Sequence, residues 1–134
     1  MQRADHLFVY GSLRADAGHE MHRVLAEGAS FVGKGSVPGA LYHLGWHPGA
    51  VPSRRPGECV RGEIYRLHDP DRLLPVLDRY EGCGPEDALP HRFERERVEA
   101  SLDGGGRTTC WIYWHRGEID EAARVESGDW VPGA

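Results

Sequence analysis

Glycine and proline interrupt this sequence so often that long regular helices have little room to form. The chain of 134 residues contains 18 glycines and nine prolines, spread along its length. Glycine adopts turn conformations readily, and proline disrupts both helix interiors and central strands. The pattern therefore predicts short strands joined by tight turns, and it argues against a helical bundle.

Six apolar or alternating segments are predicted to be strands. They cover about Leu7–Tyr10, Ser30–Val37, Ala40–Leu44, Cys59–Leu67, Phe93–Ser101 and Thr108–Trp114. The sequence LDGGGR between the last two is typical of a hairpin turn. Alternation in the last strand places Trp111 and Tyr113 on one side and Ile112 and Trp114 on the other, so both faces should be covered. Tyr113 could also present its hydroxyl to a ligand.

A helix is predicted to begin with Asp69 as N-cap and Pro70 at the first helical position, and to end at Gly82. Leu73, Leu77 and Tyr80 form its apolar stripe. Asp78 follows Leu77 directly and is expected to face away from that stripe. Because Pro75 removes a hydrogen bond inside a helix, we expect a short 3₁₀ turn followed by a brief α-helix.

An earlier helix is predicted over about Gly18 to Glu27, where Met21, Val24 and Leu25 share one face. The stretch 45–58, GWHPGAVPSRRPGE, is too rich in proline, glycine and arginine to be regular. It is predicted to be a long loop, either a functional lid or a mobile surface segment.

The length and composition of the chain predict a single soluble domain, residues 1–134, large enough to bury a core without metals or disulfides. No apolar run approaches the roughly 20 residues of a membrane span, so no membrane is expected. Three widely separated cysteines suggest neither a disulfide framework nor a zinc site, and they favour a reducing cytoplasm. A net charge of −5 with dispersed acids argues against a nucleic-acid partner.

The stretch LFVYGSLR, Leu7 to Arg14, runs from a predicted buried strand directly into Gly-Ser. In one reading, Gly11 only allows the strand to turn sharply. In the other, the bend leaves several backbone N–H groups pointing one way, which suits a carboxylate or an oxyanion. The residues of the stretch do not decide between the two.

Glu81 stands at the predicted end of a helix, directly before Gly82. The negative end of the helix dipole and partial burial would both favour the neutral carboxyl and raise its pKa toward neutrality. Such a group can take and return a proton. The alternative is that Glu81 simply points into water, as most glutamates at helix ends do.

Other chemistries are disfavoured by the surrounding sequence. Ser12 lacks the glycine two residues before it that a nucleophile elbow requires, and no histidine is marked out as its base. The pairs His19/His22 and His43/His47 lack the neighbouring acid or cysteine of strong zinc motifs. We therefore expect no metal and no cofactor.

The segments VYGSL, PGALYHLGWHPG, GEIYRL, LDRYEG, WIYW and SGDW, in this order, resemble the γ-glutamylcyclotransferase-like family, which includes γ-glutamylamine cyclotransferases and AIG2-like proteins. The resemblance spans nearly the whole chain, and YGSL together with LDxxEG is its most specific part. It implies an α+β fold, a small mixed β-barrel with flanking short helices. The ligand cavity would lie between the YGSL loop and the glutamate.

The resemblance also implies residue roles and an activity. Tyr10, Gly11, Ser12 and Leu13 match the loop whose backbone amides hold the glutamyl end of the substrate, and Glu81 matches the catalytic glutamate. The implied enzyme releases 5-oxoproline from a γ-glutamyl amine or peptide by intramolecular attack, with Glu81 as general acid and base.

Two other functions stay open at this point. The same site could bind a small anionic metabolite without turnover, because backbone N–H groups bind anions whether or not a proton shuttle lies beside them. A structural or regulatory role, suggested only by Trp130 in the closing SGDWVPGA, is the weaker alternative. The sequence fixes neither the leaving amine nor the oligomeric state.

Overall fold

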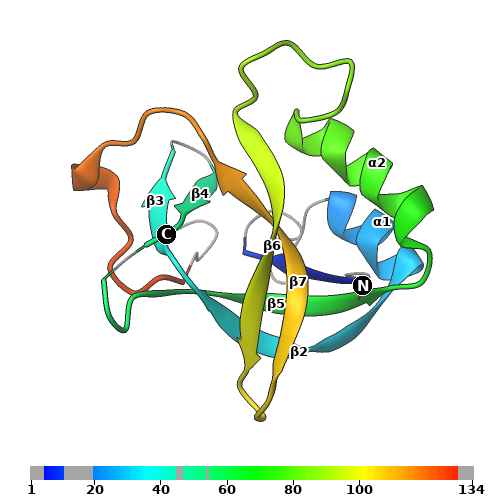
Figure 1. Cartoon of the computed structure of the whole chain (residues 1–134), viewed down its shortest axis with the longest axis horizontal. Coiled ribbons are helices and arrows are strands. Elements are labelled where there is room, and N and C mark those ends of the chain that lie inside the picture. The colour runs from blue at the N-terminus through cyan, green and yellow to red at the C-terminus, as the bar shows by residue number, and fades with distance from the viewer. Residues whose placement is uncertain (1–4, 11–19, 45–46, 54, 130–134) are drawn as a thin grey trace.

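The computed structural model of the chain describes residues 5–10, 20–44, 47–53 and 55–129 (Figure 1). The elements are β1 (His6–Val9), α1 (Glu20–Gly28), β2 (Ala29–Pro38), β3 (Ala40–His43), β4 (Pro48–Val51), β5 (Cys59–Leu67), α2 (Pro70–Glu81), β6 (Phe93–Leu102), β7 (Arg107–His115) and the 3₁₀ helix η2 (Glu121–Ala123). Each of the predicted strands is confirmed to within one residue at either end, and both predicted helices are present.

The strands β1, β5, β2, β6 and β7 close into a barrel of mixed direction, as predicted. β1 pairs antiparallel with β5 and parallel with β7, which joins the two ends of the strand order. β2 meets β6 through the pairs Gly35↔Leu102 and Ser36↔Ser101. A Cβ atom at Gly35 would lie 2.4 Å from the carbonyl oxygen of Ser101, so closure at this seam requires glycine.

The β6–β7 hairpin is the longest regular pairing of the barrel wall, and it confirms the predicted turn. Its register runs from Phe93↔His115 to Ser101↔Arg107. Gly105 and Gly106 in the turn have φ values of 108° and 90°, which non-glycine residues rarely adopt. The acidic residue and glycines of LDGGGR therefore serve the turn geometry that the sequence indicates.

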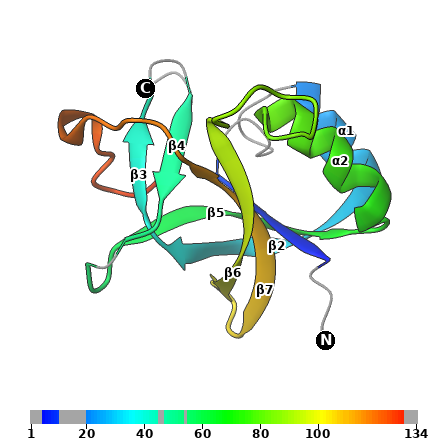
Figure 2. The same cartoon turned by 45° about the horizontal axis from the view of Figure 1, so that its top comes forward.

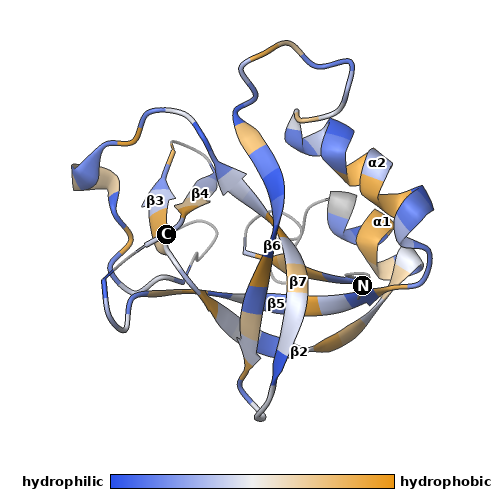
Figure 3. Ribbon diagram, in the orientation of Figure 1, coloured by the Kyte–Doolittle hydropathy of each residue, from blue (hydrophilic) through white to orange (hydrophobic). Residues whose placement is uncertain are grey.

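The barrel wall separates two hydrophobic cores. The core inside the barrel draws on all of its strands and contains Phe8, Tyr10, Val37, Val60, Ile64, Ala100, Cys110, Ile112 and Trp114. The core between barrel and helices contains Leu7, Val9, Leu25, Tyr65, Leu73, Leu74, Leu77, Phe93 and Tyr113. Both faces of β7 are therefore covered, as its alternation predicts. Figure 3 shows the apolar bands of α1 and α2 beside hydrophilic ones.

The α2 helix is continuous from Pro70 to Glu81, so the predicted 3₁₀ break at Pro75 is wrong. Pro75 is exposed, and the backbone carbonyl that it leaves without a helical partner can bond to water. Asp69 is the N-cap residue, but its side chain makes no capping hydrogen bond. In the described part of the chain, no helix is long and apolar enough to cross a membrane.

The stretch 45–58 is less irregular than predicted, because it contains the strand β4. β4 pairs antiparallel with β3 and touches β7 in parallel at Ala50↔Trp114. Pro48 is tolerated because it is the first residue of the strand. Figure 2 shows the β3–β4 hairpin standing away from α1 and α2, at the other side of the molecule.

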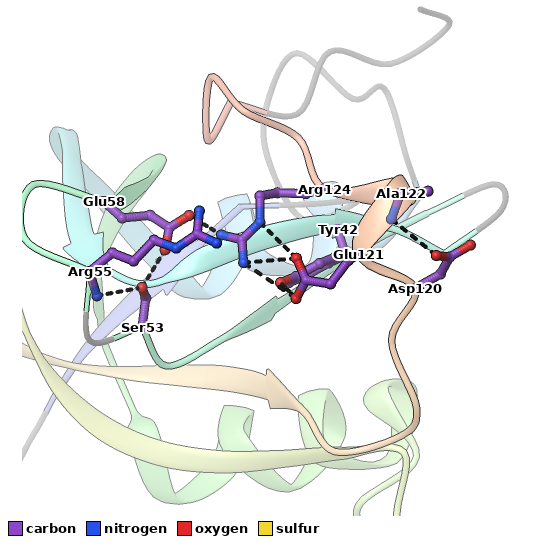
Figure 4. Close-up of polar contacts among 8 residues, drawn as sticks. All are labelled: Tyr42, Ser53, Arg55, Glu58, Asp120, Glu121, Ala122 and Arg124. Atoms are coloured by element: carbon purple, nitrogen blue, oxygen red, sulfur yellow. Dashed lines mark hydrogen bonds and ion pairs between the residues drawn. The ribbon is translucent and has the colours of Figure 1, made fainter.

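A cluster of polar side chains, which we call the C-terminal clasp, ties the segment after β7 to the β3 edge (Figure 4). It consists of Tyr42, Ser53, Glu58, Glu121 and Arg124. Arg124 forms an ion pair with Glu58, bonds to Glu121 at 3.1 Å, and lies 5.1 Å from the Tyr42 ring centroid. A backbone bridge between Tyr42 and Arg124 covers the edge of β3.

Candidate active site

Glu81 is the last residue of α2, and the local sequence fixes where the helix ends. Gly82 adopts a left-handed conformation with φ 78°. Its N–H donates to the carbonyl of Arg79 at 3.2 Å, and the N–H of Cys83 donates to the carbonyl of Asp78 at 2.9 Å. These are the two hydrogen bonds of a Schellman motif, which glycine favours because it has no Cβ. The Glu81 carboxyl is thus held on an ordered final turn.

The Glu81 side chain is partly buried, and this burial raises its pKa to about 7. Burial raises this pKa because desolvation disfavours the charged carboxylate, and burial is one of the two causes predicted from the sequence. The alternative in which Glu81 points freely into water is wrong. A carboxyl with a pKa near 7 holds a proton about half of the time at neutral pH, so it can act as acid and base.

Tyr10 brings the end of β1 close to Glu81. Burial raises the pKa of the Tyr10 hydroxyl well above its usual range, and the charge of Glu81 raises it further. The hydroxyl donates to the carbonyl of Tyr113 and accepts from the N–H of Ala50 at 3.2 Å. The Tyr10 side chain therefore connects β1, β7 and the β4 strand. The predicted role of the Tyr10 backbone amide in substrate binding stays a prediction.

Tyr113 forms another side of the same site. Its hydroxyl donates to Oδ1 of Asp78 at 2.7 Å, and its side chain is buried. Burial is the largest cause that raises the pKa of this hydroxyl far above its usual value. The hydrogen bond to Asp78 and the charges of Asp78 and Glu81 raise the pKa further. The structure thus brings Tyr10, Tyr113 and Glu81 together, as three of the predicted site residues.

Asp78 is a polar residue of the site whose position differs from the one that helix periodicity predicts. It was expected to face away from the apolar stripe, but its side chain is directed at β6 and β7 and is only 17% exposed. Its carboxylate accepts hydrogen bonds from Nε and Nη2 of Arg95 at 2.8 and 3.2 Å. A helix that packs over a barrel wall buries residues on the flank of its stripe as well as in its centre. The predicted hairpin pairs Arg95 with Tyr113, and this pairing was the signal in the sequence that could have pointed to a common partner of the two.

The remaining predicted site residues, Gly11, Ser12 and Leu13, lie outside the described residues. Their roles stay predictions. What the structure places is the residue directly before them, Tyr10, within electrostatic reach of Glu81.

Possible metal ligands and two cysteines of the described part of the chain complete the description of the site. No group of three or more His, Cys, Asp or Glu side chains among those residues is arranged to hold a metal ion. Burial raises the pKa of Cys83 to about 11 and that of Cys110 to about 12. Because the thiolate is the reactive form, burial disfavours a nucleophilic role for these two cysteines at neutral pH.

Comparison with known proteins identifies the family of this chain. A family model described as "Gamma-glutamyl cyclotransferase, AIG2-like" matches residues 7–132. The Escherichia coli K12 protein named "Gamma-glutamylcyclotransferase family protein YtfP" is 31% identical over 126 residues, which cover 93% of this chain and 95% of that protein. A Citrobacter rodentium protein of the same name is 30% identical over 128 residues, with 93% and 94% covered.

Solved structures show the same fold. The crystal structure of an AIG2-like protein from Mus musculus superposes with a TM-score of 0.72 at 25% identity, covering 97% of this chain and 90% of that one. The protein PH0828 from Pyrococcus horikoshii superposes with a TM-score of 0.64 at 24% identity, covering 94% and 89%. On the family model and the bacterial relatives together, this chain belongs to the gamma-glutamyl cyclotransferase, AIG2-like family.

Proposed function

We propose that this protein is a γ-glutamyl cyclotransferase that releases 5-oxoproline from a γ-glutamyl amine or peptide. The observation that carries the proposal is the state of Glu81, a partly buried carboxyl whose pKa is raised to about 7 beside the end of β1. Perturbed carboxyls of this kind are common at catalytic sites and uncommon on ordinary surfaces. Family membership supplies the class of reaction.

The reaction needs little beyond orientation and proton transfer. The α-amine of the substrate attacks its own γ-carbonyl carbon, a C–N bond closes the five-membered lactam, and the bond to the other nitrogen breaks. Because attacker and target belong to one molecule, holding the substrate in the reactive conformation removes much of the entropic barrier. The products are 5-oxoproline and the released amine in its protonated form.

Two protons must pass from the attacking ammonium nitrogen to the leaving nitrogen. In our proposal the Glu81 carboxylate takes them and returns them in turn, so it is regenerated at the end of the cycle. General acid–base catalysis of this kind contributes about 10²- to 10⁴-fold. The backbone amides of residues 10–13 are proposed to hold the glutamyl end of the substrate, in keeping with the family match over this segment.

The test is 5-oxoproline release from a panel of γ-glutamyl amines and peptides, followed by mass spectrometry. We expect release by the wild type and a loss of about 10²- to 10⁴-fold in Glu81→Gln, which keeps the size of the side chain but cannot ionise. Glu99→Gln is the matched control, because it makes the same change at a glutamate that is 62% exposed on β6. The control should retain wild-type activity.

Two results would count against the proposal. Equal release by the wild type and Glu81→Gln would exclude Glu81 as the shuttle. A panel compound that raises the melting temperature but is never consumed would favour the non-catalytic binding of a small anionic metabolite. Turnover of that compound would exclude the binding module.

A further inference from the structure

An ion pair between α2 and the barrel lies one helical turn before Glu81, and the proposed proton shuttle does not use it. It joins Asp78 of α2 to Arg95 of β6. The two side chains are 17% and 23% exposed, so both charges are largely shielded from water. The Arg95 guanidinium carbon also lies 4.2 Å from the centroid of the Trp111 ring, a cation–π contact that helps to hold the guanidinium in place.

Asp78 is held at its backbone and at its side chain. Its carbonyl accepts the N–H of Cys83 at 2.9 Å, in the turn that follows Glu81. Its carboxylate accepts the Tyr113 hydroxyl at 2.7 Å and the Arg95 guanidinium. The same residue therefore fixes the turn after Glu81 and anchors the end of α2 to β6 and β7. A displacement of Asp78 would displace Glu81.

The charges of Asp78, Glu81 and Arg95 act on the same neighbouring groups. Burial is the largest cause of the raised pKa of both the Tyr113 hydroxyl and the Cys83 thiol. Beyond burial, Asp78 and Glu81 raise both pKa values and Arg95 lowers them. The negative and positive members of the pair thus oppose one another at two groups, Tyr113 and Cys83, on which the charge of Glu81 also acts.

We propose that Asp78 and Arg95 form a neutral positioning pair that fixes the last turn of α2 and cancels, at Glu81, the field that either charge alone would exert. Neither residue is a catalytic residue in this proposal, since both act through Glu81. The catalytic meaning of the pair rests on the proposed function, but the electrostatic effect does not. A partly buried site transmits such fields more strongly than water does.

Among the described residues, three titratable groups other than the pair feel the charge of Glu81. They are the Tyr10 hydroxyl directly after β1, the Tyr113 hydroxyl from β7 and the Cys83 thiol from the turn after α2; Glu94 of β6 acts on the Cys83 thiol. The two hydroxyls and the thiol have raised pKa values and are neutral at pH 7. Glu94 is 44% exposed and lies beside His91, with Oε1 3.1 Å from Nδ1. From α1, His22 contacts the ring of Tyr65 on β5.

The experiment measures the pKa of Glu81 directly, by NMR titration of ¹³C-labelled glutamate carboxyls with the Glu81 signal assigned from Glu81→Gln. Arg95→Met leaves the Asp78 charge uncompensated and should raise the pKa of Glu81 by about one pH unit. Asp78→Asn leaves the Arg95 charge uncompensated and should lower it by a similar amount. The double variant Asp78→Asn/Arg95→Met should return the pKa to near its wild-type value.

Arg95→Lys separates charge from geometry, because lysine keeps the positive charge but cannot form the forked hydrogen bonds of arginine. It should leave the pKa of Glu81 near its wild-type value. Glu99→Gln and Arg107→Met are the matched controls. They remove the members of an exposed ion pair on the same hairpin, with side chains 62% and 72% exposed and an N–O distance of 3.0 Å. Both controls should leave Glu81 unchanged.

Opposite shifts in the single variants support the proposal. Shifts of the Glu81 pKa in the same direction, or no shift in either variant, would overturn it. If the variants only loosened the helix, the direction of the pKa shift would not depend on which charge was removed. If Asp78→Asn does not fold, the contrast between Arg95→Met and Arg95→Lys decides, and equal shifts in these two would overturn the pair. The titration needs no turnover. Absence of 5-oxoproline would therefore count against the proposed function alone.

Discussion

At the scale of single residues, Glu81 should lower the stability of the protein at neutral and alkaline pH. Its pKa is about 7 in the fold, against an ordinary value of 4.5. Between these values the folded state holds a proton that the unfolded state has released, so stability falls as the pH rises. Above pH 7 the cost is complete, at about 3 kcal/mol.

We therefore expect Glu81→Gln to be more stable than the wild type at pH 8 and nearly equal to it at pH 4, as measured by urea denaturation at both values. Glu99→Gln, which changes an exposed glutamate of β6, should show no such pH-dependent gain. A Glu81→Gln variant that is less stable than the wild type at pH 8 would refute the burial argument.

Tyr10 offers a second residue-scale prediction. Its hydroxyl accepts the N–H of Ala50 and donates to the carbonyl of Tyr113, and all of these groups are buried. Tyr10→Phe leaves a buried N–H without that acceptor, and we expect a loss of about 1 to 3 kcal/mol in the free energy of unfolding. Thermal denaturation checks this. Retention of full stability would mean that another group takes over the Ala50 bond.

At the scale of elements, α2 carries a proline at a position where most helices lose stability. Pro75 lies in the helix interior and is exposed, whereas Pro70 is at the first turn. Pro75→Ala restores a helical hydrogen bond and should raise the free energy of unfolding by about 1 to 3 kcal/mol. Pro70→Ala is the matched control and should give no gain, because the first helical N–H has no helical acceptor.

Calorimetric melting of the two variants measures the difference. Equal effects of Pro75→Ala and Pro70→Ala would show that α2 is held by its packing on the barrel, with no contribution from the local hydrogen bond. The persistence of the helix through Pro75 already shows that packing is strong, since Leu73, Leu74 and Leu77 are buried against the barrel and its neighbours.

The sequence predicts those elements whose signal is local. Alternation identifies the barrel strands, and LDGGGR identifies the β6–β7 turn, because both depend on neighbours along the chain. β4 was missed because its short proline-containing segment becomes a strand only by pairing with β3 and β7. Asp78 was misplaced because its partners, Arg95 and Tyr113, come from strands far along the chain. Helix periodicity alone does not include them.

The candidate site was predictable in part. The glycine that ends the helix predicts that Glu81 lies in its last turn. The apolar stripe of the helix indicates partial burial there, and burial raises the pKa of Glu81. What no local pattern contains is that β1 ends beside this glutamate. The parallel pairing of β1 with β7 brings the two together, and here the family resemblance, and not composition or spacing, supplied the expectation.

At the scale of the whole molecule, the site and the C-terminal clasp lie on different parts of the fold and respond to pH in opposite ways (Figures 1 and 4). In the clasp, a hydrogen bond from the Ser53 hydroxyl, aided by Arg124, holds the pKa of Glu58 below its ordinary value of 4.5. The stability that this carboxylate contributes is complete above its unfolded pKa, and it is lost as the pH falls through the folded one.

Taken with Glu81, whose contribution falls as the pH rises from about 4.5 to about 7, this predicts a stability maximum near pH 4.5, with each side of the maximum owed to a different glutamate. Melting temperatures measured from pH 3 to 9 should show both limbs. Glu58→Gln should weaken the acid limb, because the ionisable group is gone, while leaving the limb between pH 5 and 8. Glu81→Gln should flatten the limb between pH 5 and 8 and leave the acid limb unchanged. If one variant changed both limbs, the two clusters would be coupled through the barrel, in contradiction to their separation in the fold.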